Sequence, residues 1–123
     1  GLGSGLMAFF GGRLLPGVAV MIDAIQLEDK ITEADLVITG EGRTDGQTLR
    51  GKVCAGVAKI AAAHDVPCVI LSGAVDGDFS QLYSQGVTAV FSISPGPRTL
   101  TEAYAAVEDD LATAAENVVR LIE

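Results

Sequence analysis

Residues 36–53 read Leu-Val-Ile-Thr-Gly-Glu-Gly-Arg-Thr-Asp-Gly-Gln-Thr-Leu-Arg-Gly-Lys-Val. The apolar residues at the start predict a buried strand over residues 36–39, and a helical pattern begins near Val53. The glycine-rich stretch between them, residues 40–52, is therefore predicted to be a loop between a strand and a helix. Such a loop presents backbone N–H groups at the positive end of a helix, where an anion is favoured.

Charges of both signs are concentrated in this loop. It holds three of the eight basic residues of the chain within positions 43–52, and two carboxylates, Glu41 and Asp45, lie among them. Phosphoryl transfer needs cations for phosphate oxygens and carboxylates for a metal ion or a proton. Lys52 stands directly before a helix, where a cation is unfavourable unless an anion is nearby. The loop is also longer than most connections of its kind, which favours a binding role over a bare turn.

Other interpretations of the loop remain open. Residues 46–52 almost match the phosphate-binding loop of P-loop enzymes, but position 53 is Val where that motif needs Ser or Thr for Mg²⁺. Asp45 suits a turn as well as a metal or proton site, and Glu41 is similar. Arg43 also fits a solvated surface charge. His64, at the end of the helix that follows the loop, is interpreted as structural.

The rest of the chain predicts an α/β protein. Strands are expected over residues 36–39, 67–71 and 88–93, and helices over residues 53–64, 79–85 and from Pro97 onward, where Thr99 and Glu102 fit a capping box. The order strand, helix, strand, helix, strand, helix predicts a parallel sheet with helices on its faces. Helices are also expected over residues 1–12 and 18–25. Asp76 and Asp78, beside Gly77, are interpreted as a turn.

In such a sheet, ligands bind at the carboxyl ends of the strands. Three loops leave the predicted strands at that edge: residues 40–52, residues 72–74 and residues 94–98. All three are rich in Gly, Ser or Pro. Because loop chemistry and topology agree, this edge is the expected ligand site.

Composition excludes several classes of function. The net charge is −8, which argues against a nucleic-acid-binding surface. The apolar runs are too short to span a membrane. The two cysteines, Cys54 and Cys68, are interpreted as free thiols, and Cys54 as a small buried hydrophobe; these thiols predict a cytoplasmic protein. The chain begins at Gly1 inside a glycine-rich pattern, so we expect it to be an excerpt of a longer protein.

The chain resembles the bacterial glycerate kinase family, the type that phosphorylates D-glycerate with ATP. The similarity runs through nearly the whole chain. It is carried by residues 34–43 with Asp45, by Gln47-Thr48, Gly51-Lys52 and residues 56–58, by the glycine-rich residues 1–6, and by residues 91–93 with residues 95–97. One departure is Val53-Cys54, where the family pattern leads us to expect Pro at the second position.

The resemblance implies a larger enzyme of two α/β domains, one of them a Rossmann-like, flavodoxin-like parallel sheet with helices on both faces. Residues 1–34 would be a glycine-rich and helical connecting segment from the preceding domain, and residues 35–123 the C-terminal part of the Rossmann-like domain. The implied cofactors are ATP and Mg²⁺, and the substrate is D-glycerate, with 2-phosphoglycerate the favoured product. The remaining partner is the rest of its own chain or a second copy.

The expected site residues all come from the loop and its borders. Lys52 and Arg43 would contact phosphate oxygens, and Asp45 or Glu41 would bind Mg²⁺ or orient the glycerate hydroxyl. The residues expected to bind the cofactor are Gly40, Gly42, Thr48, Gly51 and Lys52. Two alternatives are a non-catalytic phosphate-binding or nucleotide-binding module and a receiver-like signalling domain, which needs an acidic pair and a phosphoacceptor Asp at strand ends.

Overall fold

The structure is a computed structural model that describes residues 5–10, 13–16, 24–41, 53–94 and 96–122. Its elements, in chain order, are β1 (Gly5–Phe10), β2 (Arg13–Pro16), α1 (Ala24–Thr32), β3 (Leu36–Glu41), α2 (Val53–Ala63), β4 (Cys68–Ser72), α3 (Gln81–Ser84), β5 (Ala89–Ser92), α4 (Leu100–Ala105) and α5 (Val107–Ile122). The three strands and the helices predicted from residue 35 onward are therefore confirmed, with small shifts in their bounds.

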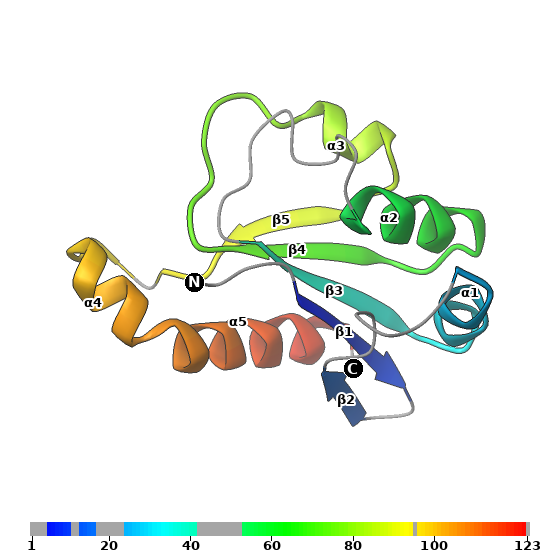
Figure 1. Cartoon of the computed structure of the whole chain (residues 1–123), viewed down its shortest axis with the longest axis horizontal. Coiled ribbons are helices and arrows are strands. Elements are labelled where there is room, and N and C mark those ends of the chain that lie inside the picture. The colour runs from blue at the N-terminus through cyan, green and yellow to red at the C-terminus, as the bar shows by residue number, and fades with distance from the viewer. Residues whose placement is uncertain (1–4, 11–12, 17–23, 42–52, 95, 123) are drawn as a thin grey trace.

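One five-stranded sheet organises the molecule, in the order β2-β1-β3-β4-β5. Strands β3, β4 and β5 are parallel to one another, as predicted. Strand β1 pairs antiparallel with β3 on one side and with β2 on the other. The predicted parallel sheet is thus the larger part of a mixed one (Figure 1).

The helix expected over residues 1–12 is wrong, because residues 5–10 form β1. Their pairing partner supplies the physical reason: β3 is apolar and buried, so its free edge needs a further strand to satisfy its N–H and C=O groups. Most of the helix expected over residues 18–25 lies outside the described residues, and its last two residues open α1. The division of the chain at residues 34 and 35 stays a prediction, although β1 and β2 share a sheet with β3.

Helices cover both faces of the sheet (Figure 1). One apolar cluster joins α1, α2 and α3 to the face that carries Val37, Cys68 and Ile70. A second cluster joins α5 to the opposite face, which carries Leu36, Ile38, Val69 and Leu71. All five residues of β4 are buried, which is why its sequence is an uninterrupted apolar run until Ser72.

The turn from α3 into β5 lies close against α2. Gly86 has a φ of +106°, and a Cβ built on it would lie 2.3 Å from the backbone oxygen of Ala58 in α2. Both the backbone conformation and the close approach therefore require glycine at this position.

The C-terminal helix predicted as one continuous element is divided in two at Ala106. The predicted capping box is present: the Thr99 hydroxyl accepts a hydrogen bond from the Glu102 backbone N–H, and the Glu102 carboxylate accepts from the Thr99 N–H. Leu111 and Val118 of α5 pack in the second cluster, whereas Leu121, three residues further along the helix, is 78% exposed.

Candidate functional site

The carboxyl ends of the three parallel strands meet at one edge of the sheet, which we call the carboxyl edge. The last residue of β3, Glu41, is the register partner of Ser72, the last residue of β4. Ser72 is in turn the register partner of Ser92, the last residue of β5. The three strands therefore end side by side at this edge, as the sequence predicts.

Most of the expected site residues lie outside the described residues. This holds for Gly42, Arg43, Asp45, Thr48, Gly51 and Lys52, and their roles stay predictions. The structure describes the residues on either side of the predicted loop, which are Glu41, the last residue of β3, and Val53, the first residue of α2. The first turn of α2 contains no acidic residue, so no side chain there neutralises the positive helix end.

Of the expected residues, only Gly40 and Glu41 are among those described. Gly40 is buried in the last part of β3, where its register partners are Gly5 of β1 and Leu71 of β4. Gly40 therefore belongs to the sheet rather than to the loop. Glu41 is the final residue of β3 and the register partner of Ser72, so it lies at the carboxyl edge. Of the two expected metal ligands, Glu41 is the one among the described residues.

Serine hydroxyls dominate the described part of this edge. The Ser72 side chain is fully buried and its Oγ donates to the Ala74 carbonyl oxygen at 2.7 Å. In the segment after β5, the Ser94 Oγ donates to the Gly96 carbonyl oxygen, also at 2.7 Å, and the Ser94 backbone N–H donates to the Ser92 Oγ at 3.3 Å. These hydrogen bonds fix the path of the backbone just beyond β4 and β5.

Arg98, a further cation in the segment after β5, is engaged elsewhere. Its Nη1 donates to the Asp110 Oδ2 at 2.9 Å, and the two side chains are only 21% and 15% exposed. This half-buried pair ties the segment before α4 to the first turn of α5. In the described part of the chain it is a structural contact, not a free cation facing a ligand.

The interpretations of His64 as structural and of Asp78 as a turn residue fit the contacts found. The His64 Nε2 lies 2.9 Å from the Glu28 Oε1, which joins α2 to α1. Asp78 accepts hydrogen bonds from the hydroxyl and the backbone N–H of Ser80, and these bonds hold its pKa below its ordinary value. Within the described residues, no group of three or more His, Cys, Asp or Glu side chains is placed to hold a metal ion.

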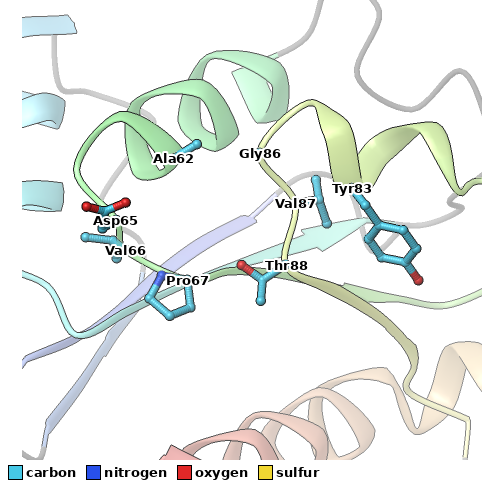
Figure 2. A pocket seen from close by; sticks show the side chains of 8 residues that line it. All are labelled: Ala62, Asp65, Val66, Pro67, Tyr83, Gly86, Val87 and Thr88. Atoms are coloured by element: carbon cyan, nitrogen blue, oxygen red, sulfur yellow. The ribbon is translucent and has the colours of Figure 1, made fainter.

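A shallow hollow of about 380 Å³ lies at the opposite edge of the sheet. It is lined in part by the residues just before β4 and β5, Pro67 and Thr88, and Figure 2 shows Asp65 and Tyr83 at its two ends. Because ligands of parallel sheets bind beyond the carboxyl ends of the strands, this hollow is on the wrong side for the predicted chemistry.

Comparison with known proteins identifies the family. The model of the glycerate kinase family matches residues 1–123. The chain belongs to this family. It is 38% identical over 118 residues both to a glycerate kinase of Bacillus cereus and to the glycerate 2-kinase of Escherichia coli strain K12; each alignment covers 96% of this chain and 31% of the relative. The chain thus spans about a third of the length of these relatives.

A solved structure agrees with the assignment. A crystal structure from Salmonella typhimurium LT2, assigned to glycerate kinase 2, superposes with a TM-score of 0.55 at 34% identity, and the match covers 87% of this chain and 26% of that one. Among the described residues, no helix has the length and apolarity needed to cross a bilayer.

Ser92 is a residue at the edge that the sequence analysis did not single out. It falls inside the strand predicted over residues 88–93, so it was interpreted as part of the sheet. A signal was present, since a serine breaks the apolar pattern two positions after Val90, at the end of a strand whose neighbour also ends in serine. Only the register places Ser72 beside Glu41 and Ser92 beside Ser72.

Proposed function

We propose that this chain is the C-terminal portion of a cytoplasmic enzyme that transfers a phosphoryl group from ATP to D-glycerate. The observation that carries the proposal is the match to the glycerate kinase family over the whole chain. The alignment of the carboxyl ends of β3, β4 and β5 at one edge supports it, because open α/β sheets bind their ligands there. We favour 2-phosphoglycerate as the product, since one relative is named glycerate 2-kinase.

In this proposal the loop of residues 42–52 holds the phosphate groups. Lys52 precedes a helix whose first turn lacks an acidic residue, so an external anion would be favoured there. Lys52 and Arg43 neutralise charge on the transferred phosphoryl group, Gly42 and Gly51 let the backbone approach the nucleotide, and Thr48 is a further nucleotide contact. Most catalysis in phosphoryl transfer is positioning and electrostatic stabilisation of this kind.

Glu41 and Asp45 are the proposed Mg²⁺ ligands. Mg²⁺ prefers oxygen ligands and usually keeps several waters, so one or two carboxylates suffice. The position of Glu41 at the end of β3, beside Ser72, is compatible with that role. When bound, the ion would neutralise charge on the phosphate oxygens; the carboxylates themselves hold it in place or orient the glycerate hydroxyl.

A non-catalytic module is the second candidate for the chain as it stands. The observation that favours it is the length of this chain, which covers only 31% of the glycerate kinase of Bacillus cereus. A receiver-like domain is less well supported: it needs an acidic pair and a phosphoacceptor Asp at strand ends, whereas β3 ends in Thr-Gly-Glu and β4 and β5 end in serine.

The test is an assay of ATP-dependent D-glycerate phosphorylation in a protein of the relatives' length that carries these residues. We expect activity, and we expect Lys52→Ala to lower kcat/KM by about 10²–10⁴, the scale of one lost transition-state charge contact. Lys59→Ala is a matched control, since this exposed lysine of α2 lies two turns further along the helix. Less than a threefold loss for Lys52→Ala would refute the assignment of this residue, and no glycerate phosphorylation by the parent protein would refute the function.

A further inference from the structure

The apolar core on the α2 side of the sheet stops short of the carboxyl edge. Along β4 this face carries Cys68 and Ile70, and along β5 it carries Val90, which all belong to or pack against the cluster beneath α2. The next position on the same face is Ser72 in β4 and Ser92 in β5, because side chains alternate between faces along a strand. Hydroxyl groups therefore replace hydrocarbon where β4 and β5 reach the carboxyl edge.

The three serines of this edge differ in what their hydroxyl protons do. Ser72 and Ser94 each donate to a backbone carbonyl oxygen at 2.7 Å, and Ser72 is also fully buried. Their protons are therefore unavailable to a ligand. Ser92 is exposed, and its Oγ accepts the Ser94 N–H. Among the described residues, no acceptor is found for the Ser92 proton.

An accepted N–H bond orients the Ser92 oxygen while leaving its proton to be donated. We propose that Ser92 donates this hydrogen bond to an anionic oxygen of the ligand at the carboxyl edge, either a phosphate oxygen of the nucleotide or the carboxylate of glycerate. This inference rests on the proposed function, because it assigns a ligand contact to the same edge. Hydrogen bonds to charged acceptors are the strong ones, so one such contact is large enough to measure.

The experiment is a titration, followed by NMR, of an isotopically labelled protein of the relatives' length that carries these residues, with Mg·ADP and separately with D-glycerate. The variants are Ser92→Ala, which removes the donor, and Ser92→Thr, which keeps it. Ser84→Ala is the matched control, because this exposed serine of α3 already donates to the Gln81 carbonyl oxygen. Far-ultraviolet circular dichroism verifies that each variant is folded.

We expect Ser92→Ala to weaken one of the two ligands about tenfold, while Ser92→Thr and Ser84→Ala stay within threefold of the wild type. The ligand that is weakened identifies which anion the hydroxyl contacts. In the wild type, we also expect ligand-induced shifts at the amides of residues 92–94, a result that needs no variant and stands even if Ser92→Ala fails to fold.

Two results would overturn the inference, and they have different consequences. If the wild type binds a ligand but neither Ser92→Ala nor the amides of residues 92–94 respond, Ser92 is not a contact and the kinase proposal is unaffected. If the folded wild type binds neither Mg·ADP nor D-glycerate, the carboxyl edge of this chain is not an anion site, and the proposed function loses its structural support as well.

Discussion

Substitution of Gly86 by alanine tests how closely the α3–β5 turn is packed against α2. The new Cβ would lie 2.3 Å from the oxygen and 2.8 Å from the carbon of the Ala58 carbonyl, distances that real Cβ atoms essentially never show. Both atoms belong to the backbone of α2 at its buried residue Ala58, so relief requires α2 and the turn to separate. The φ of +106° adds backbone strain for any residue with a side chain.

The two effects give the size of the expected change. Backbone strain of this type costs about 1–3 kcal/mol, and overpacking a close contact costs about 1–3 kcal/mol. We therefore expect Gly86→Ala to lower the free energy of unfolding by about 3–4 kcal/mol. For a chain of this length that corresponds to a fall in Tm of about 12–16 °C.

Substitutions at two other glycines distinguish the effect of backbone strain from the effect of the steric clash. Gly77 has a φ of +63° but nothing within 4 Å of its Cβ position, so Gly77→Ala retains the strain without the clash and should cost about 1 kcal/mol. Gly56 lies inside α2 with open space around it, so Gly56→Ala should stabilise the protein by about 0.5–1 kcal/mol. Urea unfolding followed by circular dichroism measures all three. Equal stability of the Gly86 and Gly77 variants would refute the packing argument.

Three further outcomes are expected. Thr99→Ala removes the capping box and should cost about 1 kcal/mol at neutral pH by urea unfolding. The Thr99 hydroxyl, and after it the Thr99 N–H, hold the pKa of Glu102 below its ordinary value. The contribution of the Glu102 carboxylate to stability is therefore present above the unfolded pKa, about 4.3, and is lost as the pH falls through the lowered folded pKa. A cost of Thr99→Ala that does not shrink in acid would contradict this. Asp45→Asn should keep the fold but shift the Mg²⁺ dependence or nearly abolish turnover of the longer enzyme, and unchanged kcat with an unchanged Mg²⁺ titration would leave Asp45 a turn residue. The 123-residue chain alone should phosphorylate no glycerate and should associate with itself or with the rest of its own chain, because the proposed cleft needs a second side; a monomer with the full rate would refute the fragment assignment.

The parallel part of the sheet could be predicted because its signals are local. Leu36 to Ile38 and the run ending at Ser72 are short apolar segments between turn residues, and a helical pattern follows each connection. The same locality made the capping box at Thr99 predictable, since its partners are three residues apart. The loop of residues 40–52 is predicted to be a site because charge and glycine are concentrated in a single stretch of sequence, and this role stays a prediction.

Strand β1 was not predictable in the same way. Residues 5–10 mix glycine with large apolar residues in no clear period, so their conformation depends on the partner they meet. That partner is the open edge of β3, which lies about thirty residues further along the chain. The exposure of Leu121 and the break at Ala106 likewise depend on where α5 leaves the sheet and not on the helical period.

The sequence by itself determined the parallel α/β core, the edge at which a ligand would bind and, through its motifs, the family. Only the tertiary structure decided which polar groups of that edge are already engaged. Arg98 is a cation in the sequence but the partner of Asp110 in the fold, and of the serines at residues 72, 92 and 94 only Ser92 keeps a proton to donate within the described residues. Residue type determines which hydrogen bonds a side chain can donate or accept. Strand register and loop path determine whether a neighbouring group of the protein already makes those hydrogen bonds.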